Sequence, residues 1–262
     1  MMIIDAHIHR GMMAAQYVYD LSLERLLESM DFLGIGTAIS SHCLSLMQGD
    51  FDGGTEAALK DYEFSGGRIK SFFYYDARFP ERSLGVMREL ENNPVFCGIK
   101  IHPSWSFTYA DDEAYRPVWE YARERQLPIL SHSWDVSAVN VKQKYSHPAR
   151  FEKYLAEFPE VQLVLAHSGG RYRAIKCAAG LARKYGNLAF DIAGDIAEDG
   201  FLEYLVREAG SGRIMYGSDC PMMDQKTMLG VVYGADIELC EKEDILYNTA
   251  RRIYLGGADG TD

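Results

Sequence analysis

Short apolar segments recur along the chain, and the stretches between them carry apolar residues at helical spacing. Eight such segments occur, at residues 2–9, 37–42, 69–76, 96–102, 128–132, 162–167, 187–192 and 214–219. Their last residues lie 25 to 35 positions apart, which is about the length of one strand, one helix and two loops. Eight repeated strand–helix units predict an α/β fold, a (β/α)8 barrel.

The intervening stretches indicate helices that surround such a barrel. Leu23, Leu26, Met30 and Leu33 repeat at helical spacing before Gly34, which can end a helix. Residues 115–125 and 174–185 show the same pattern. Because no linker, repeat or low-complexity segment divides the chain, we expect a single domain over residues 1–262.

Composition and charge narrow the classes of function. The formal net charge of −11 opposes binding to nucleic acid and to anionic membrane surfaces. No apolar run approaches the roughly 20 residues that cross a bilayer. The five cysteines are scattered and form no CxxC pair, which argues against a disulfide framework. We therefore expect a cytoplasmic protein that acts on a small molecule.

The histidines are concentrated at one end of the predicted strands. Five of the seven end a strand, and Asp219 ends the eighth. Active sites of such barrels lie at the C-terminal ends of the strands. Packing alone gives no reason for imidazoles to gather there, so this placement favours chemistry.

His7 and His9 stand two residues apart on the first strand, with side chains on one face and Cα atoms about 6.6 Å apart. Both can reach one metal ion, although an isolated HxH pair is a weak signal. Asp5 shares this face and could support a ligand. Asp191, at the end of the seventh strand, either supports the site or caps the next helix.

His132, His167 and Asp219 extend this pattern to the fifth, sixth and eighth strands. Nitrogen and oxygen ligands of this kind suit zinc, manganese or iron. Either histidine alone could be a hydrogen-bonded core residue, and Asp219 could cap a helix. Their common position at the barrel rim favours a metal site.

Taken together, this set of residues resembles the amidohydrolase superfamily. The segments IIDAHIH, GIKIHP, AHSGG, YGSDCP and NTARRIY are similar to its amidohydrolase-related branch, which includes hydrolases, hydratases and decarboxylases such as aminocarboxymuconate semialdehyde decarboxylase. The resemblance spans nearly the whole chain.

The resemblance implies roles for these residues. His7, His9, His132 and Asp219 would bind one divalent metal ion, Zn²⁺ before Mn²⁺ or Fe²⁺, while His167 and Asp219 would be catalytic. In binuclear members a carbamylated lysine on the fourth strand bridges two ions, and Lys100 holds that position. The single-metal arrangement is favoured, with Lys100 and His102 contacting substrate.

Arginines suit the recognition of a carboxylate-bearing substrate. Arg10 follows HxH, and Arg171 follows AHSGG. Either could equally be a solvated surface residue. Trp105, Trp134, Tyr17 and Tyr19 could wall the same pocket, or could serve packing alone.

Three functions follow in order of preference. The first is hydrolysis of a small amide, lactone or ester through metal-activated water. The second is nonoxidative decarboxylation of a small carboxylic acid, and the third is a barrel that binds metal without catalysis. A homodimer is compatible with each of these functions.

Overall fold

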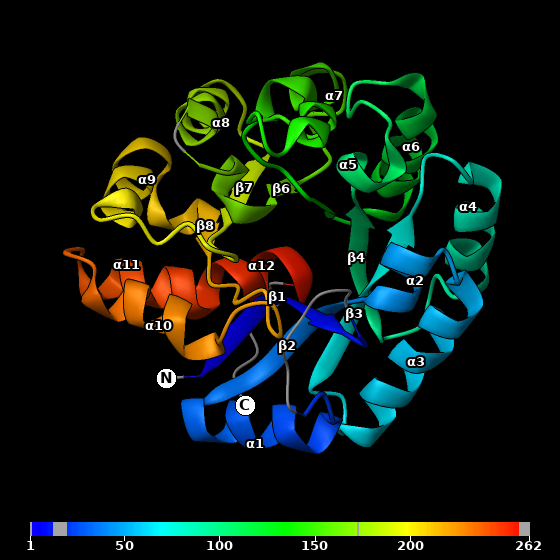
Figure 1. Cartoon of the computed structure of the whole chain (residues 1–262), viewed down its shortest axis with the longest axis horizontal. Helices are drawn as coiled ribbons and strands as arrows, with labels where there is room; N and C mark the ends of the chain where they lie inside the picture. Colours follow the sequence, from blue (N-terminus) through cyan, green and yellow to red (C-terminus); the bar gives the residue numbers. More distant parts are fainter. Residues whose placement is uncertain (1, 13–19, 172, 257–262) are drawn as a thin grey trace.

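The computed structural model of the chain describes residues 2–12, 20–171 and 173–256. Eight strands form one parallel sheet in the order of the chain, and helices lie around them (Figure 1). The strands are β1 (Ile3–Arg10), β2 (Ile35–His42), β3 (Ile69–Tyr75), β4 (Phe96–Ile101), β5 (Ile129–Ser131), β6 (Leu163–Leu165), β7 (Leu188–Asp191) and β8 (Ile214–Met215). The predicted (β/α)8 barrel is confirmed.

The helices of the outer ring alternate with the strands. They are α1 (Leu23–Leu33), α2 (Cys43–Gln48), α3 (Phe51–Phe64), α4 (Pro80–Glu89), α5 (Pro103–Ser106), α6 (Arg116–Arg125), α7 (Glu152–Glu157), α8 (Arg173–Lys184), α9 (Phe201–Ala209), α10 (Gln225–Gly234), α11 (Leu239–Glu243) and α12 (Thr249–Tyr254). Helix α1 begins where the Ser22 hydroxyl accepts from the Arg25 amide, and it ends at Gly34 with φ 74°. No helix in these described ranges is long and apolar enough to cross a membrane.

Two apolar clusters hold the barrel together. The larger lies between the strands and the surrounding helices, and includes the fully buried Trp119. The smaller includes Ile4, Leu130 and Ala189 from the strands and Tyr254 from α12. Side chains two residues apart on a strand share a face, so His132 and Asp191 follow Leu130 and Ala189 toward the C-terminal end of the interior. Along the same strands, the interior thus changes from apolar residues of the smaller cluster to polar residues at the C-terminal end.

The sheet closes where the last strand meets the first. Because β8 spans two residues, the segment after it completes this seam. The Ala6 amide donates to the Tyr216 carbonyl at 2.9 Å, and the Asp219 amide donates to the His7 carbonyl at 2.8 Å. The His9 amide donates to the carbonyl of Cys220 at 2.6 Å. The seam therefore fixes Asp219 beside the HxH pair.

Candidate metal centre

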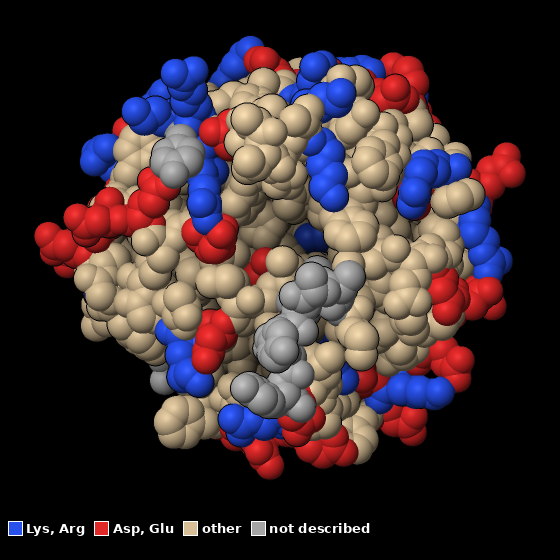
Figure 2. Space-filling model, in the orientation of Figure 1, with Lys and Arg blue, Asp and Glu red and all other residues tan. Residues whose placement is uncertain are grey.

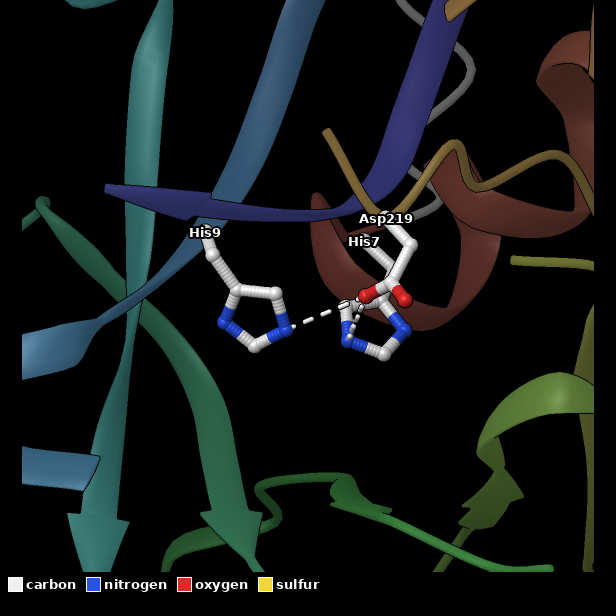
Figure 3. Close-up of side chains that lie close together, drawn as sticks. All are labelled: His7, His9 and Asp219. Atoms are coloured by element: carbon white, nitrogen blue, oxygen red, sulfur yellow. Dashed lines mark ion pairs between the residues drawn. The ribbon is translucent and has the colours of Figure 1, made fainter. Parts of the chain in front are cut away.

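Three side chains from the two sides of the seam converge at the C-terminal end of the barrel (Figure 3). The Asp219 Oδ1 atom lies 3.1 Å from His9 Nε2 and 3.7 Å from His7 Nε2. One ligand atom from each residue lies within 4.8 Å of the other two. We call these three residues the HHD cluster. Three of the four predicted metal ligands are thus brought together.

The barrel orients both histidines of the HHD cluster through their other ring nitrogen. His7 Nδ1 donates to the Asp191 carboxylate at 2.9 Å, and His9 Nδ1 donates to the Ser41 carbonyl at 3.2 Å. These acceptors fix the protons on Nδ1 and leave a lone pair on each Nε2. A carboxylate or carbonyl behind a histidine is the arrangement that supports a metal ligand.

The electrostatics of the HHD cluster fit a cation. All three side chains are buried, and Asp219 Oδ1 has no hydrogen-bond donor among the described residues. Burial, and then the charge of Lys100, lower the pKa of His7 to about 4. Burial by itself would raise the pKa of Asp219, but His9, His167 and His7 lower it further than burial raises it. Neutral imidazoles and an ionised carboxylate are the states that bind metal.

Lys100 is the basic group nearest to the HHD cluster. It is buried on β4, and its Nζ lies 3.0 Å from His7 Nε2, so the amine donates to the lone pair that a metal would use. Burial lowers the pKa of Lys100 to about 8. The predicted contact of Lys100 with substrate stays a prediction, and a carbamate at a second ion stays the alternative.

The other predicted histidines surround the same space. The ring of His167 lies 5.3 Å from that of His7, and its Nδ1 donates to the Ala193 carbonyl at 2.9 Å. The rings of His102 and His132 are stacked at 4.0 Å. His132 lies outside the HHD cluster. Its Nε2 is 3.0 Å from the side-chain oxygen of Gln143. Its role as the fourth ligand stays a prediction.

Asp191 links His7 on β1 to His167, which follows β6. Its Oδ2 accepts from His7, and its Oδ1 accepts from the amides of His167 and Ala193 at 2.8 and 3.0 Å. His7, His167 and Asp191 also offer ligand atoms within 4.8 Å of one another. Because both oxygens of Asp191 are already bonded, we interpret this carboxylate as support for the histidines.

The backbone of the site is held in a sparsely populated conformation. His167, Ser168 and Asp219 have φ values of 60°, 52° and 63°. Each such residue costs on the order of 1 kcal/mol, which the surrounding bonds must offset. Gly194 completes the arrangement, because a Cβ atom there would lie 2.8 Å from His167 Nδ1. Three of the five described non-glycine residues with positive φ thus lie at this site, and the other two, Phe107 and Gln126, lie elsewhere.

Comparison with known proteins places this geometry in a family. A family model described as Amidohydrolase matches residues 4–255. The chain belongs to this amidohydrolase family. It is therefore an enzyme of the hydrolase or lyase kind. No curated protein matches it in sequence.

Three solved structures share the amidohydrolase barrel over nearly their full length. The 2,6-dihydroxybenzoate decarboxylase from Rhizobium is 15% identical, with a TM-score of 0.75, and 96% of this chain and 98% of that one are covered. The 5-carboxyvanillate decarboxylase from Sphingomonas paucimobilis is 16% identical, with a TM-score of 0.72 and coverage of 97% and 99%. A dihydroxybenzoic acid decarboxylase from a Polaromonas species, with bound manganese, is 14% identical, with a TM-score of 0.70 and coverage of 96% of each chain.

The predicted substrate arginines of this amidohydrolase differ in their surroundings. Arg10 donates to Asp61 at 2.8 Å and to the Leu21 carbonyl at 2.8 Å, contacts that hold it at the edge of the barrel. Arg171 pairs with Asp195, and its guanidinium lies 5.6 Å from the Trp134 ring. Arg171 reaches the histidines through Trp134, which lies 5.2 Å from His167, whereas Arg10 lines a cavity together with His9.

The two predicted tryptophans each lie beside a different histidine of the site. Trp105 lies 5.6 Å from His102, and Trp134 lies 6.4 Å from His132, measured between ring centroids. Tyr17 and Tyr19 lie outside the described residues.

A cavity of about 420 Å³ opens beside His9, a volume within the range of small-molecule sites.

Several supporting groups could not be identified from the sequence. The carbonyls of Ser41 and Ala193 carry no sequence signal, because every residue has one. Gln143 lies on a 3-10 turn, η2 (Val141–Tyr145), eleven residues after His132 and within no recognisable motif. Asp5 was a candidate support, and it acts through the seam: it accepts from the Ser218 amide and hydroxyl at 2.9 and 2.7 Å.

Proposed function

We propose that this protein is a divalent-metal-dependent lyase that removes CO2 from a small aromatic or unsaturated carboxylic acid. The sequence favoured hydrolysis and placed decarboxylation second. The names of the compared structures reverse that order, since all three are decarboxylases of aromatic acids. Because identities near 15% support only the fold, the proposal also needs support from this chain's own residues.

The observation that carries the proposal is the row formed by Arg171, Trp134 and His167. It places a cation, a flat apolar surface and an imidazole next to the HHD cluster. Arg171 Nε is buried and donates to no described residue, so it has an N–H left for a carboxylate. A guanidinium, an aromatic ring and an imidazole are groups that bind a planar carboxylate. Figure 2 shows basic side-chain atoms deep in the central hollow of this face, which also favours an anionic ligand.

The predicted ligands His7, His9, His132 and Asp219 would hold a divalent ion, Mn²⁺ or Zn²⁺. When bound, such an ion supplies a positive charge that orients the substrate oxygens and stabilises negative charge on them. The neutral imidazole of His7 and the ionised carboxylate of Asp219 are the states that this requires.

His167 is suited to move the proton that decarboxylation requires. When the bond to the carboxylate carbon breaks, CO2 leaves without the bonding electrons, and the remaining carbon takes up a proton. The Ala193 carbonyl holds a proton on His167 Nδ1, which leaves Nε2 free to carry the transferred proton. Trp134 meets the His167 ring in a T-shaped contact, with ring centroids 5.2 Å apart.

The test is turnover by the protein loaded with Mn²⁺ or Zn²⁺ on two substrate panels. One panel holds hydroxybenzoates, carboxyvanillate and unsaturated acids, monitored for CO2, and the other holds lactones, esters and amides. We expect CO2 release that is lost in His167→Asn. Arg171→Met should raise KM for the acid, whereas the matched change at the exposed Arg173 should not.

Two results would overturn the proposal. Turnover of lactones or esters with no release of CO2 would restore hydrolysis as the function. Silence on both panels, from protein shown to bind the metal, would favour the non-catalytic barrel.

A further inference from the structure

The histidines of the site differ in which ring nitrogen is free. In His7, His9 and His167 the Nδ1 atom donates to an acceptor of the barrel, at 2.9, 3.2 and 2.9 Å. Each therefore keeps its lone pair on Nε2. His132 is the exception, since its one hydrogen bond is made by Nε2, to Gln143 Oε1 at 3.0 Å. Its Nδ1 has no hydrogen-bond partner among the described residues.

Gln143 is itself held by a buried polar network. Its Oε1 lies 2.8 Å from the hydroxyl of Ser104 and 2.9 Å from that of Ser146. The two hydroxyls lie 2.6 Å apart. All three side chains are at least nine-tenths buried, so the network cannot rearrange freely into water.

The number of donors accounts for the proton on His132. An amide oxygen has two lone pairs. One serine hydroxyl donates to the other, so a single hydroxyl proton remains for Gln143 Oε1. The second lone pair then accepts from His132 Nε2–H, so both lone pairs of Gln143 Oε1 are used.

We propose that Gln143 is a positioning residue that keeps the proton of His132 on Nε2, so that His132 offers Nδ1 to the metal. This inference rests on the proposed metal site. It accounts for the bond between His132 Nε2 and Gln143 Oε1, in a ring that lies 5.1 Å from that of His167. The loop after β5 would thereby select the tautomer of the fourth ligand, as Asp191 and the Ser41 carbonyl do for the others.

The first test reads the tautomer directly in metal-free protein. Long-range ¹H–¹⁵N spectra of ¹⁵N-histidine-labelled protein at mildly alkaline pH distinguish protonated from unprotonated ring nitrogens, and the His132→Gln variant identifies the signals of His132. We expect protonated Nε2 and unprotonated Nδ1, and the reverse pattern would overturn the proposal. This readout needs neither metal nor turnover, so it stands apart from the proposed function.

The second test compares variants by tautomer and by affinity for Mn²⁺, measured with a competing chelator. Gln143→Leu removes the acceptor and should give a mixture of tautomers with at least tenfold weaker binding. Gln143→Glu retains an acceptor and should keep the tautomer. Ser104→Ala is the matched control, because Ser146 can still donate to Gln143.

Circular dichroism and thermal melting show whether each variant is folded. Gln143→Leu that folds and leaves both the tautomer and the affinity unchanged would refute the role of Gln143. Tighter Mn²⁺ binding in that variant would refute it as well, because Gln143 would then hold His132 away from the metal.

Discussion

Replacing Asp191 with asparagine tests whether this carboxylate sets the metal affinity through His7. The asparagine oxygen can still accept the amides of His167 and Ala193, so its NH2 group must face His7 Nδ1. The opposite orientation would leave two buried amides unsatisfied, at about 1–3 kcal/mol each. The proton of His7 is therefore expected to move to Nε2, the atom that points into the HHD cluster.

The expected loss follows from the role of such supports. Removing a partner behind a metal ligand lowers affinity by about 10- to 100-fold, or about 1.4–2.8 kcal/mol. The assay is competition for Mn²⁺ against a chelator of known affinity, with urea unfolding as the test of the fold. Asp199→Asn, at an exposed position of the same loop, is the control. Unchanged affinity in folded Asp191→Asn would refute the reasoning.

The remaining predictions address the ligands, the pH response and the core. Asp219→Asn removes the unpaired carboxylate oxygen and should weaken Mn²⁺ binding at least 100-fold in the same competition assay, and a smaller loss would argue against a cation between the seam residues. Burial lowers the pKa of His7, His102 and His132 below the ordinary 6.5, so the unfolded chain binds protons that the folded chain does not. As the pH is lowered below 6.5, the unfolding free energy of chelator-treated protein should therefore decrease by about 1.4 kcal/mol per pH unit for each such group. In urea titrations of His102→Asn, the unfolding free energy should change less steeply with pH, by the equivalent of one proton. A slope identical to that of the unchanged protein would contradict the lowered pKa of His102. Trp119→Ala should lose about 3–5 kcal/mol of unfolding free energy in urea without loss of metal affinity, whereas Ala at the exposed Phe32 should change stability by under about 0.5 kcal/mol.

The barrel could be predicted because its signal is repeated. Each apolar strand is followed by a helical stretch, and the ends predicted for α1 and β2 agree with the structure at Leu33 and His42. The strand ends also placed His7, His9 and Asp219 at one rim, since the rim of a parallel barrel follows from the direction of its strands.

The supports of the site could not be predicted in the same way. Whether Asp191 would cap a helix or hold His7 depends on a contact across 184 positions of sequence, which no local pattern encodes. The positions of Gln143 and Arg171 depend on loop conformations that follow β5 and β6. The left-handed backbone at His167 and Asp219 opposes local preference, and bonds made elsewhere in the fold maintain it.

The predicted metal site at the seam between β8 and β1 needs residues from both ends of the chain. Two of the predicted ligands come from the first ten residues and a third is residue 219, and three backbone hydrogen bonds join the two sides. A bound ion would contact residues on both sides of the seam, so its binding energy would also oppose local opening there. Metal should therefore slow amide hydrogen exchange at Ala6, His9 and Asp219 more than elsewhere in the sheet. During synthesis β1 can pair across the seam only after β8 has been made. A chain that stops before residue 214 would have neither a closed barrel nor a place to hold the ion.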